Sequence, residues 1–128
     1  MEIAQRNTRL IIAQLVAEVL RVRHRSYYPE MPFMVTIEIT VILMTIFWAE
    51  CNGKPLSARG LSMQLEMPRA TLVRRLSFLK SRGEIRREGQ RLRVNTAIFA
   101  TPSRDEAIRS LRQTIIDAGH ALAKMDAD

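Results

Sequence analysis

One segment constrains the fold of this 128-residue chain more than any other, the apolar run FMVTIEITVILMTIFWAEC at residues 33–51. Between Phe33 and Trp48 its only charged residue is Glu38, so most of its surface must leave water. Apolar and polar residues alternate in its first half, as in a β-strand, but the alternation is lost in its second half and the run exceeds an ordinary strand. We therefore predict a central buried helix that ends near Asn52-Gly53.

A membrane span is the alternative for this segment. Its apolar stretch of about 17 residues is at the short limit for crossing a bilayer, and it contains three threonines and lacks basic residues close to its ends. The N-terminal residues show no basic-then-apolar signal pattern, and the single cysteine, Cys51, cannot form an internal disulfide. We expect no membrane contact and a cytoplasmic location.

Long helices are predicted at both ends of the chain, at 1–26 and 102–126. The first is apolar on nearly every side, with Leu10, Ala13, Ala17 and Leu20 in one stripe and Ile12, Val16 and Val19 in another. The second has apolar residues from Ile108 to Met125 at steps of three and four, as in a coiled coil. One core cannot cover all of these faces, so we predict a homodimer, although the second helix alone would also suit packing on its own domain. The predicted dimer-interface residues are Leu10, Ala13, Ala17, Leu20, Ile108, Leu111, Ile115, Ala118 and Leu122.

The net charge of +7 is concentrated in one part of the chain. Residues 56–96 contain ten basic and three acidic residues, which is the whole surplus, whereas the remaining residues contain ten of each. Nine of the ten basic residues are Arg, whose planar guanidinium suits bidentate contact to phosphate and to guanine edges. This local excess favours a nucleic-acid partner over a merely solvated surface, which usually mixes charges of both signs.

The same basic region contains clear signals for secondary structure. Ser57 can cap a short helix that continues to Leu65, and a second helix over 69–81 places Leu72, Leu76 and Leu79 inward. Gly83 is expected to stop that helix. EIRREGQRLRVN then predicts a basic hairpin that turns at Gly89, with Ile85, Leu92 and Val94 facing inward.

This order of helix, tight turn, helix and basic hairpin resembles the winged helix-turn-helix arrangement. SARGLSMQLEMPRATLVRRLSFLKSRGEIRR, at 57–87, is similar to that pattern without gaps. In the pattern a small residue and a Leu, here Ala58 and Leu61, seat the first helix. An Arg-x-Thr-hydrophobic-x-Arg run, starting here at Arg69, opens the recognition helix, and Leu-x-x-Leu-x-x-x-Gly closes it. Glu66 stands where the short turn commonly has Gly.

With the flanking helices included, nearly the whole chain resembles the MarR family of bacterial transcriptional regulators. The resemblance implies a mainly α fold with a small β-hairpin wing, a single winged-helix domain over 1–128 with the helix-turn-helix and wing at 54–96, and dimerisation by the long terminal helices. It also implies that two recognition helices enter successive major grooves about one turn apart. Small ligands lodge between the dimerisation and DNA-binding parts of such proteins, but nothing else in this sequence supports a small-molecule effector.

The resemblance assigns recognition to helix 69–81 and backbone or minor-groove contact to the basic wing 84–94. We expect Arg69 and Ala70 to meet base edges and Thr71, Arg74 and Arg75 to meet phosphates. The predicted DNA-binding residues are Arg69, Ala70, Thr71, Val73, Arg74, Arg75, Arg86, Arg87, Arg91 and Arg93.

We therefore expect a sequence-specific, double-stranded DNA-binding transcriptional regulator, a homodimer that acts as a repressor. One alternative is a winged-helix protein-interaction module whose basic face binds an acidic partner, and another is a non-specific architectural DNA binder.

Catalysis finds no support in the sequence. The two histidines, His24 and His120, lie on the terminal helices, and no glycine-rich phosphate loop or Cys/His metal spacing occurs. We expect no catalytic residues, no metal site and no cofactor.

Cys51 suits a small buried hydrophobe better than a redox switch. Four aromatic residues, Tyr27, Tyr28, Phe33 and Trp48, suit either a core or an effector pocket.

Overall fold

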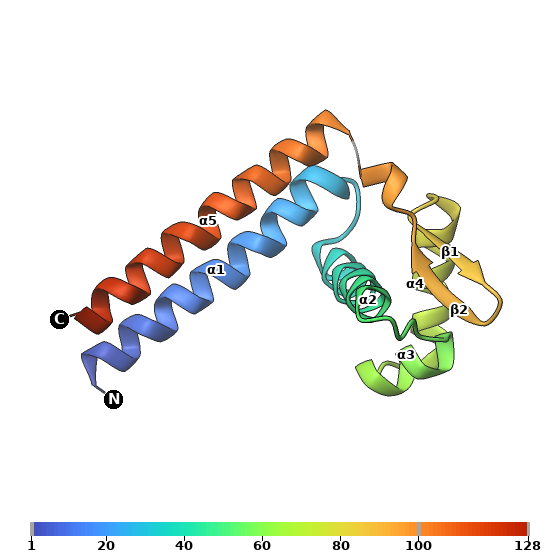
Figure 1. Ribbon diagram of the computed structural model, residues 1–128, viewed down its shortest axis with the longest axis horizontal. Coiled ribbons are helices and arrows are strands. Elements are labelled where there is room, and N and C mark those ends of the chain that lie inside the picture. Colours follow the sequence, from blue (N-terminus) through green and yellow to red (C-terminus); the bar gives the residue numbers. More distant parts are fainter. Residues whose placement is uncertain (1, 100, 128) are drawn as a thin grey trace. The chain divides into compact units, whose positions relative to one another are not determined.

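The computed structural model describes residues 2–99 and 101–127 and is mainly helical, with one small antiparallel β-hairpin. This confirms the predicted fold class at that level. The elements in chain order are α1 (Ile3–Tyr27), α2 (Phe33–Cys51), α3 (Ala58–Leu65), α4 (Arg69–Ser81), β1 (Ile85–Glu88), β2 (Arg91–Val94), the 3-10 turn η1 (Thr96–Phe99) and α5 (Pro102–Ala127) (Figure 1). They form two compact units, Met1–Met31 with Thr101–Asp128 and Pro32–Ala100.

The first unit is an antiparallel pair of long helices, α1 and α5, whose free ends lie at the same end of the pair (Figure 1). On α1 a half-buried series runs through Thr8, Ile11, Leu15 and Glu18 to the buried Val22. Their steps of three and four define one face of the helix. On α5 the matching face begins at the buried Ala107 and continues through half-buried positions at Leu111, Thr114, Ala118, Leu122 and Met125.

Aromatic and guanidinium groups join the last turn of α1 to the first turns of α5. The Arg23 guanidinium lies 4.4 Å from the centre of the Tyr27 ring and 5.4 Å from that of Tyr28. The Arg104 guanidinium of α5 lies 4.9 Å from the same Tyr27 ring. Thr101 starts α5 through its side-chain oxygen, which accepts a hydrogen bond from the Arg104 backbone N–H. These contacts position the junction of the two helices.

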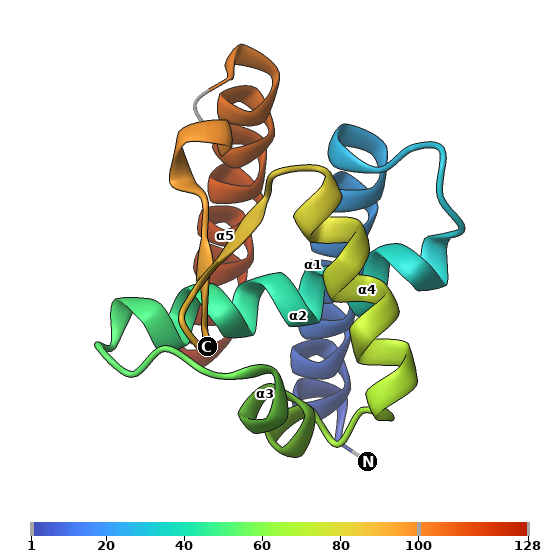
Figure 2. The same cartoon turned by 90° about the vertical axis from the view of Figure 1, so that its right-hand side faces the viewer.

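The second unit is built on α2, which contacts α3, α4 and β2 (Figure 2). The prediction of a helix over the apolar run is confirmed, and it ends at Cys51, before the positive-φ Gly53. Its buried side chains, Ile39, Ile42, Leu43 and Ile46 among them, form the centre of the core. Packing on three elements therefore outweighs the β-propensity of its Val, Ile and Thr residues.

Burial of α2 is less complete than the sequence suggested. Several large apolar side chains on it are exposed, and Trp48 is the most exposed of them. By length and composition α2 is the one helix in the described part of the chain that would suffice to cross a membrane. The core helix of a soluble protein has the same length and composition, so this feature does not distinguish the two.

Local sequence signals set the path from α3 to α4. The Ser57 side chain accepts a hydrogen bond from the Gly60 N–H at 3.1 Å and caps α3, as predicted. Glu66 then adopts a left-handed conformation with φ 52°, and it is the one non-glycine residue with positive φ in the described chain. Pro68 precedes α4, whose bounds and buried residues Leu72, Leu76 and Leu79 are those predicted.

The hairpin forms where it was predicted, with its turn at Gly89. Ile85 pairs with Val94 and Glu88 pairs with Arg91, and Gly89 makes the turn with φ 62°. Ile85, Leu92 and Val94 are buried, as the alternation of apolar and basic residues predicted. The Glu50 carboxylate of α2 accepts a hydrogen bond from the Val94 N–H at 2.8 Å, so β2 is attached to the central helix as well as to β1.

Candidate nucleic-acid interface

The orientation of α4 follows from its three buried leucines. Because these side chains pack inward, the opposite side of α4 presents Ala70 and Arg74 to solvent, and Val73 lies on its flank. Arg69 lies one turn before Leu72 and is exposed at the first residue of the helix. All four were predicted to lie on an accessible face, and all four are exposed. Thr71 is half-buried and lies closer to the edge of that face.

Ion pairs divide the ten basic residues of 56–96 into two groups. Arg75, Arg82, Arg86 and Arg93 each lie within 4.0 Å of a carboxylate. The other six have no carboxylate within that distance in the described parts of the chain. These six residues are Arg59, Arg69, Arg74, Lys80, Arg87 and Arg91.

Arg75, predicted to contact phosphate, holds two helices together. Its Nε donates a hydrogen bond to Glu38 Oε2 at 2.9 Å, which ties α4 to α2. The two side chains are only 18% and 31% exposed. A half-buried guanidinium that already binds a carboxylate is a poor phosphate ligand, because releasing it would leave Glu38 without its partner.

Two of the predicted hairpin cations are also engaged by carboxylates. Arg86 donates a hydrogen bond to Glu88 at 3.0 Å, and Nε of Arg93 lies 2.7 Å from the same Glu88 carboxylate oxygen. Arg93 also lies 3.8 Å from Glu50. Arg91 instead donates to the Pro55 carbonyl at 3.4 Å, which leaves its charge unneutralised. Arg87 is exposed and has no carboxylate partner among the described residues.

Two adjoining hollows connect four of the unpaired cations. The larger, of about 340 Å³, lies between α4 and the hairpin and is lined by Arg69, Lys80 and Arg87 around apolar residues. The smaller, of about 100 Å³, lies between α3 and α4 and is lined by Arg59 and Arg69. Arg69 and Val73 border both hollows. We call the surface formed by Arg59, Arg69, Lys80 and Arg87 the cationic face.

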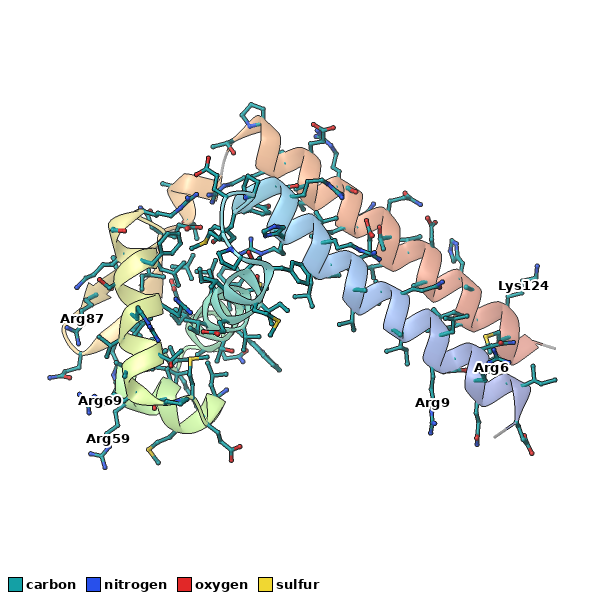
Figure 3. All side chains as sticks on the ribbon, turned by 180° about the vertical axis from the view of Figure 1, so that it is seen from behind. Arg6, Arg9, Arg59, Arg69, Arg87 and Lys124 are labelled. Carbon is teal, nitrogen blue, oxygen red and sulfur yellow. The ribbon has the colours of Figure 1, made fainter. Side chains whose placement is uncertain are left out.

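Figure 3 shows how the cationic face is assembled from separate elements. Arg59 comes from α3, Arg69 from α4 and Arg87 from β1, and the three side chains point outward on the same side of this unit. Arg59 and Lys80 were absent from the predicted binding residues. Their contribution to the charge excess was visible in the sequence, but their position beside Arg69 depends on how α3, α4 and the hairpin pack.

The residues predicted for the dimer interface are divided between exposed and half-buried positions in the first unit. Leu10, Ala13 and Ala17 on α1 and Ile108 and Ile115 on α5 are exposed. Leu20, Leu111, Ala118 and Leu122 are half-buried, and Ala118 borders the groove between α1 and α5 with Ile11 and Leu15. Part of the predicted seam on α5 therefore packs within the chain, and the rest faces solvent.

The other candidate groups do not form a site in the described residues. Tyr27 and Tyr28 are buried beside Arg23, whereas Phe33 and Trp48 lie near opposite ends of α2, about 22 Å apart along its axis. Cys51 is exposed, not buried as expected, because it lies on the last turn of α2 before the Asn52-Gly53 turn. Within 2–99 and 101–127 no group of three His, Cys, Asp or Glu side chains is placed to hold a metal ion.

Comparison of the chain with protein-family models, with curated protein sequences and with solved structures returned no match.

Proposed function

We propose that this chain is a sequence-specific, double-stranded DNA-binding transcriptional regulator. In this proposal α3, its turn and α4 form a helix-turn-helix, α4 is the recognition helix, and the β1–β2 hairpin is the wing of a MarR-like winged helix. The protein acts in the cytoplasm as a homodimer that binds an inverted repeat and represses transcription by covering a promoter.

The cationic face is the observation that carries this proposal. Arg59, Arg69, Lys80 and Arg87 come from three elements, border two adjoining hollows and have no carboxylate partner among the described residues. Acidic residues nearby pair with four other cations of the same region, Arg75, Arg82, Arg86 and Arg93, but with none of the four residues of the cationic face. Unpaired guanidinium groups beside an exposed helix face suit phosphates and guanine edges.

Exposed apolar surface on the first unit supports the homodimer. Leu10, Ile12 and Val16 on α1 and Ile108 and Ile115 on α5 are all large and exposed. These side chains occupy several turns of two long helices, and leaving them in water costs free energy that a second copy of the helix pair would recover.

Selection of duplexes from a random library at about 150 mM salt tests the proposal, with the purified chain as bait. We expect an inverted repeat whose half-sites lie about 10 base pairs apart, centre to centre. If each dimer neutralises about eight phosphates, the logarithm of affinity should fall with the logarithm of salt concentration at a slope of roughly −7. Retention of duplexes without a consensus would support architectural binding. If no duplex were retained even at low salt, the cationic face would instead bind an acidic protein partner.

Arg69→Ala separates base recognition from general charge. We expect it to weaken binding to the selected duplex by about 1–3 kcal/mol relative to random DNA, since Arg69 borders both hollows at the start of α4. Arg6→Ala on α1 removes the same charge from an exposed site on the other unit and serves as the control. If Arg69→Ala and Arg6→Ala showed the same preference for the selected duplex over random DNA, base recognition by Arg69 would be contradicted.

A further inference from the structure

An apolar strip interrupts the charged surface of α4. Val73 is 53% exposed, and the exposed Ala70 lies one turn before it on the same side of the helix. The core does not need Val73, because Leu72, Leu76 and Leu79 already fill the buried side of α4. A branched apolar side chain on this surface is therefore available to a partner.

The neighbours of Val73 are the cations of the cationic face. Val73 borders the larger hollow with Arg69, Lys80 and Arg87, and it borders the smaller hollow with Arg59 and Arg69. Of the two apolar residues that border both hollows, Ala58 and Val73, Val73 is the exposed one and has the larger side chain. A ligand that spans both hollows would therefore also cover Val73.

The major groove of DNA offers one apolar group to such a side chain. Base edges there display hydrogen-bond donors and acceptors, and the exception is the C5-methyl group of thymine. Resting on the DNA-binding function proposed above, we infer that Val73 is a specificity-determining residue that contacts a thymine C5-methyl group in each half-site. Its two methyl groups provide a larger apolar contact than the single methyl group of Ala70.

Deoxyuridine provides a direct test, because it differs from thymidine only in lacking the C5-methyl group. Each thymine of the selected duplex is replaced in turn by deoxyuridine, and affinity is measured by fluorescence anisotropy. For the wild type we expect one position per half-site at which the replacement weakens binding about fourfold, the binding ratio that corresponds to burial of one methyl group. Replacement in both half-sites should weaken binding about fifteenfold.

Val73→Ala should reduce the effect at that position to less than about twofold, since little apolar contact remains. Val41→Ala is the matched control, because Val41 is also exposed but lies on α2 and borders neither hollow. It should keep the full fourfold effect. Val73→Thr retains the size and β-branching of the side chain and should give a deoxyuridine effect between those of the wild type and Val73→Ala. This second variant keeps the test valid if Val73→Ala does not fold.

The outcomes distinguish this inference from the proposed function. Suppose that the wild type selects a consensus and yet binds it with the same affinity whichever thymine is replaced by deoxyuridine. That result would support the regulator function and overturn the role of Val73. Retention of the full effect by Val73→Ala would do the same. Failure to select any consensus would overturn both.

Discussion

Two adjacent arginines on α4 should respond to the same substitution in opposite ways. Arg74 is exposed and has no carboxylate within 4.0 Å among the described residues. Arg75 donates a 2.9 Å hydrogen bond to Glu38 and is 18% exposed. We consider Arg74→Met and Arg75→Met, because Met keeps much of the side-chain length and has a similar helix propensity.

The loss of stability is expected only for Arg75→Met. A hydrogen bond between charged groups contributes about 1.5–3 kcal/mol, and partial exposure of this pair brings the expected loss to roughly 1–2 kcal/mol. Arg74→Met removes no such contact, so the free energy of unfolding should change by no more than about 0.5 kcal/mol. Urea unfolding of the two variants beside the wild type measures this difference.

The effect on DNA binding is expected only for Arg74→Met. Each phosphate contact adds about 0.9 to the magnitude of the salt slope, so loss of one contact per subunit should reduce it by about 1.8 for a dimer. Arg75→Met should leave the slope unchanged when binding is measured well below its unfolding temperature. The two variants therefore separate a DNA contact from a structural contact at neighbouring positions.

A third variant tests the assignment of Arg75 to Glu38. Combining Arg75→Met with Glu38→Gln should recover part of the lost stability, because the carboxylate is no longer left half-buried without its partner. A structural role for Arg75 would be contradicted if Arg75→Met reduced the salt slope as much as Arg74→Met while the free energy of unfolding stayed constant. That result would mean that Arg75 exchanges Glu38 for phosphate at little cost.

Two further predictions concern the turn and the helix pair. Glu66→Gly should stabilise the chain by roughly 0.5–1 kcal/mol in urea unfolding, since relief of about 1–2 kcal/mol of left-handed strain exceeds the entropy cost of Gly. Glu66→Ala removes the same charge but keeps the strain, so an equal gain from Ala would show that charge is the cause. Light scattering at low micromolar concentration should give the wild type twice the 14.7 kDa chain mass and Leu10→Glu the monomer mass. Gln5→Glu on the same helix should remain dimeric, and a dimeric Leu10→Glu would exclude Leu10 from the interface.

The second unit was predictable from sequence because its signals are local. Ser57 caps α3 and Pro68 precedes α4, and each acts within one turn of its own position. Gly89 turns the hairpin because it adopts a positive φ at little cost. The spacing of three leucines then determines which side of α4 is buried. Signals of this kind need no knowledge of distant residues, so the bounds of α3 and α4 and the turn of the hairpin both followed from them.

The packing face of α1 was not predictable in the same way. Apolar residues surround that helix, and the face that contacts α5 includes the polar Thr8 and Glu18. Both apolar stripes identified in the sequence, the one with Leu10 and the one with Val16, include large side chains that are exposed. A hydrophobic pattern selects a face only when one face is clearly more apolar than the others. On α1 the shape of the partner helix decides instead.

Contacts that form only in the fold also determine which residues make up the cationic face. The sequence shows ten basic residues, but it does not show which of them are neutralised in the fold. Glu38 precedes Arg75 by 37 residues and binds it, while Glu88 engages Arg86 on the same strand and Arg93 across the hairpin. These carboxylates pair with three of the predicted ligands. Arg59, Arg69, Lys80 and Arg87, together with Arg74 and Arg91, have no carboxylate partner among the described residues, so the acidic residues define the candidate interface as much as the basic residues do.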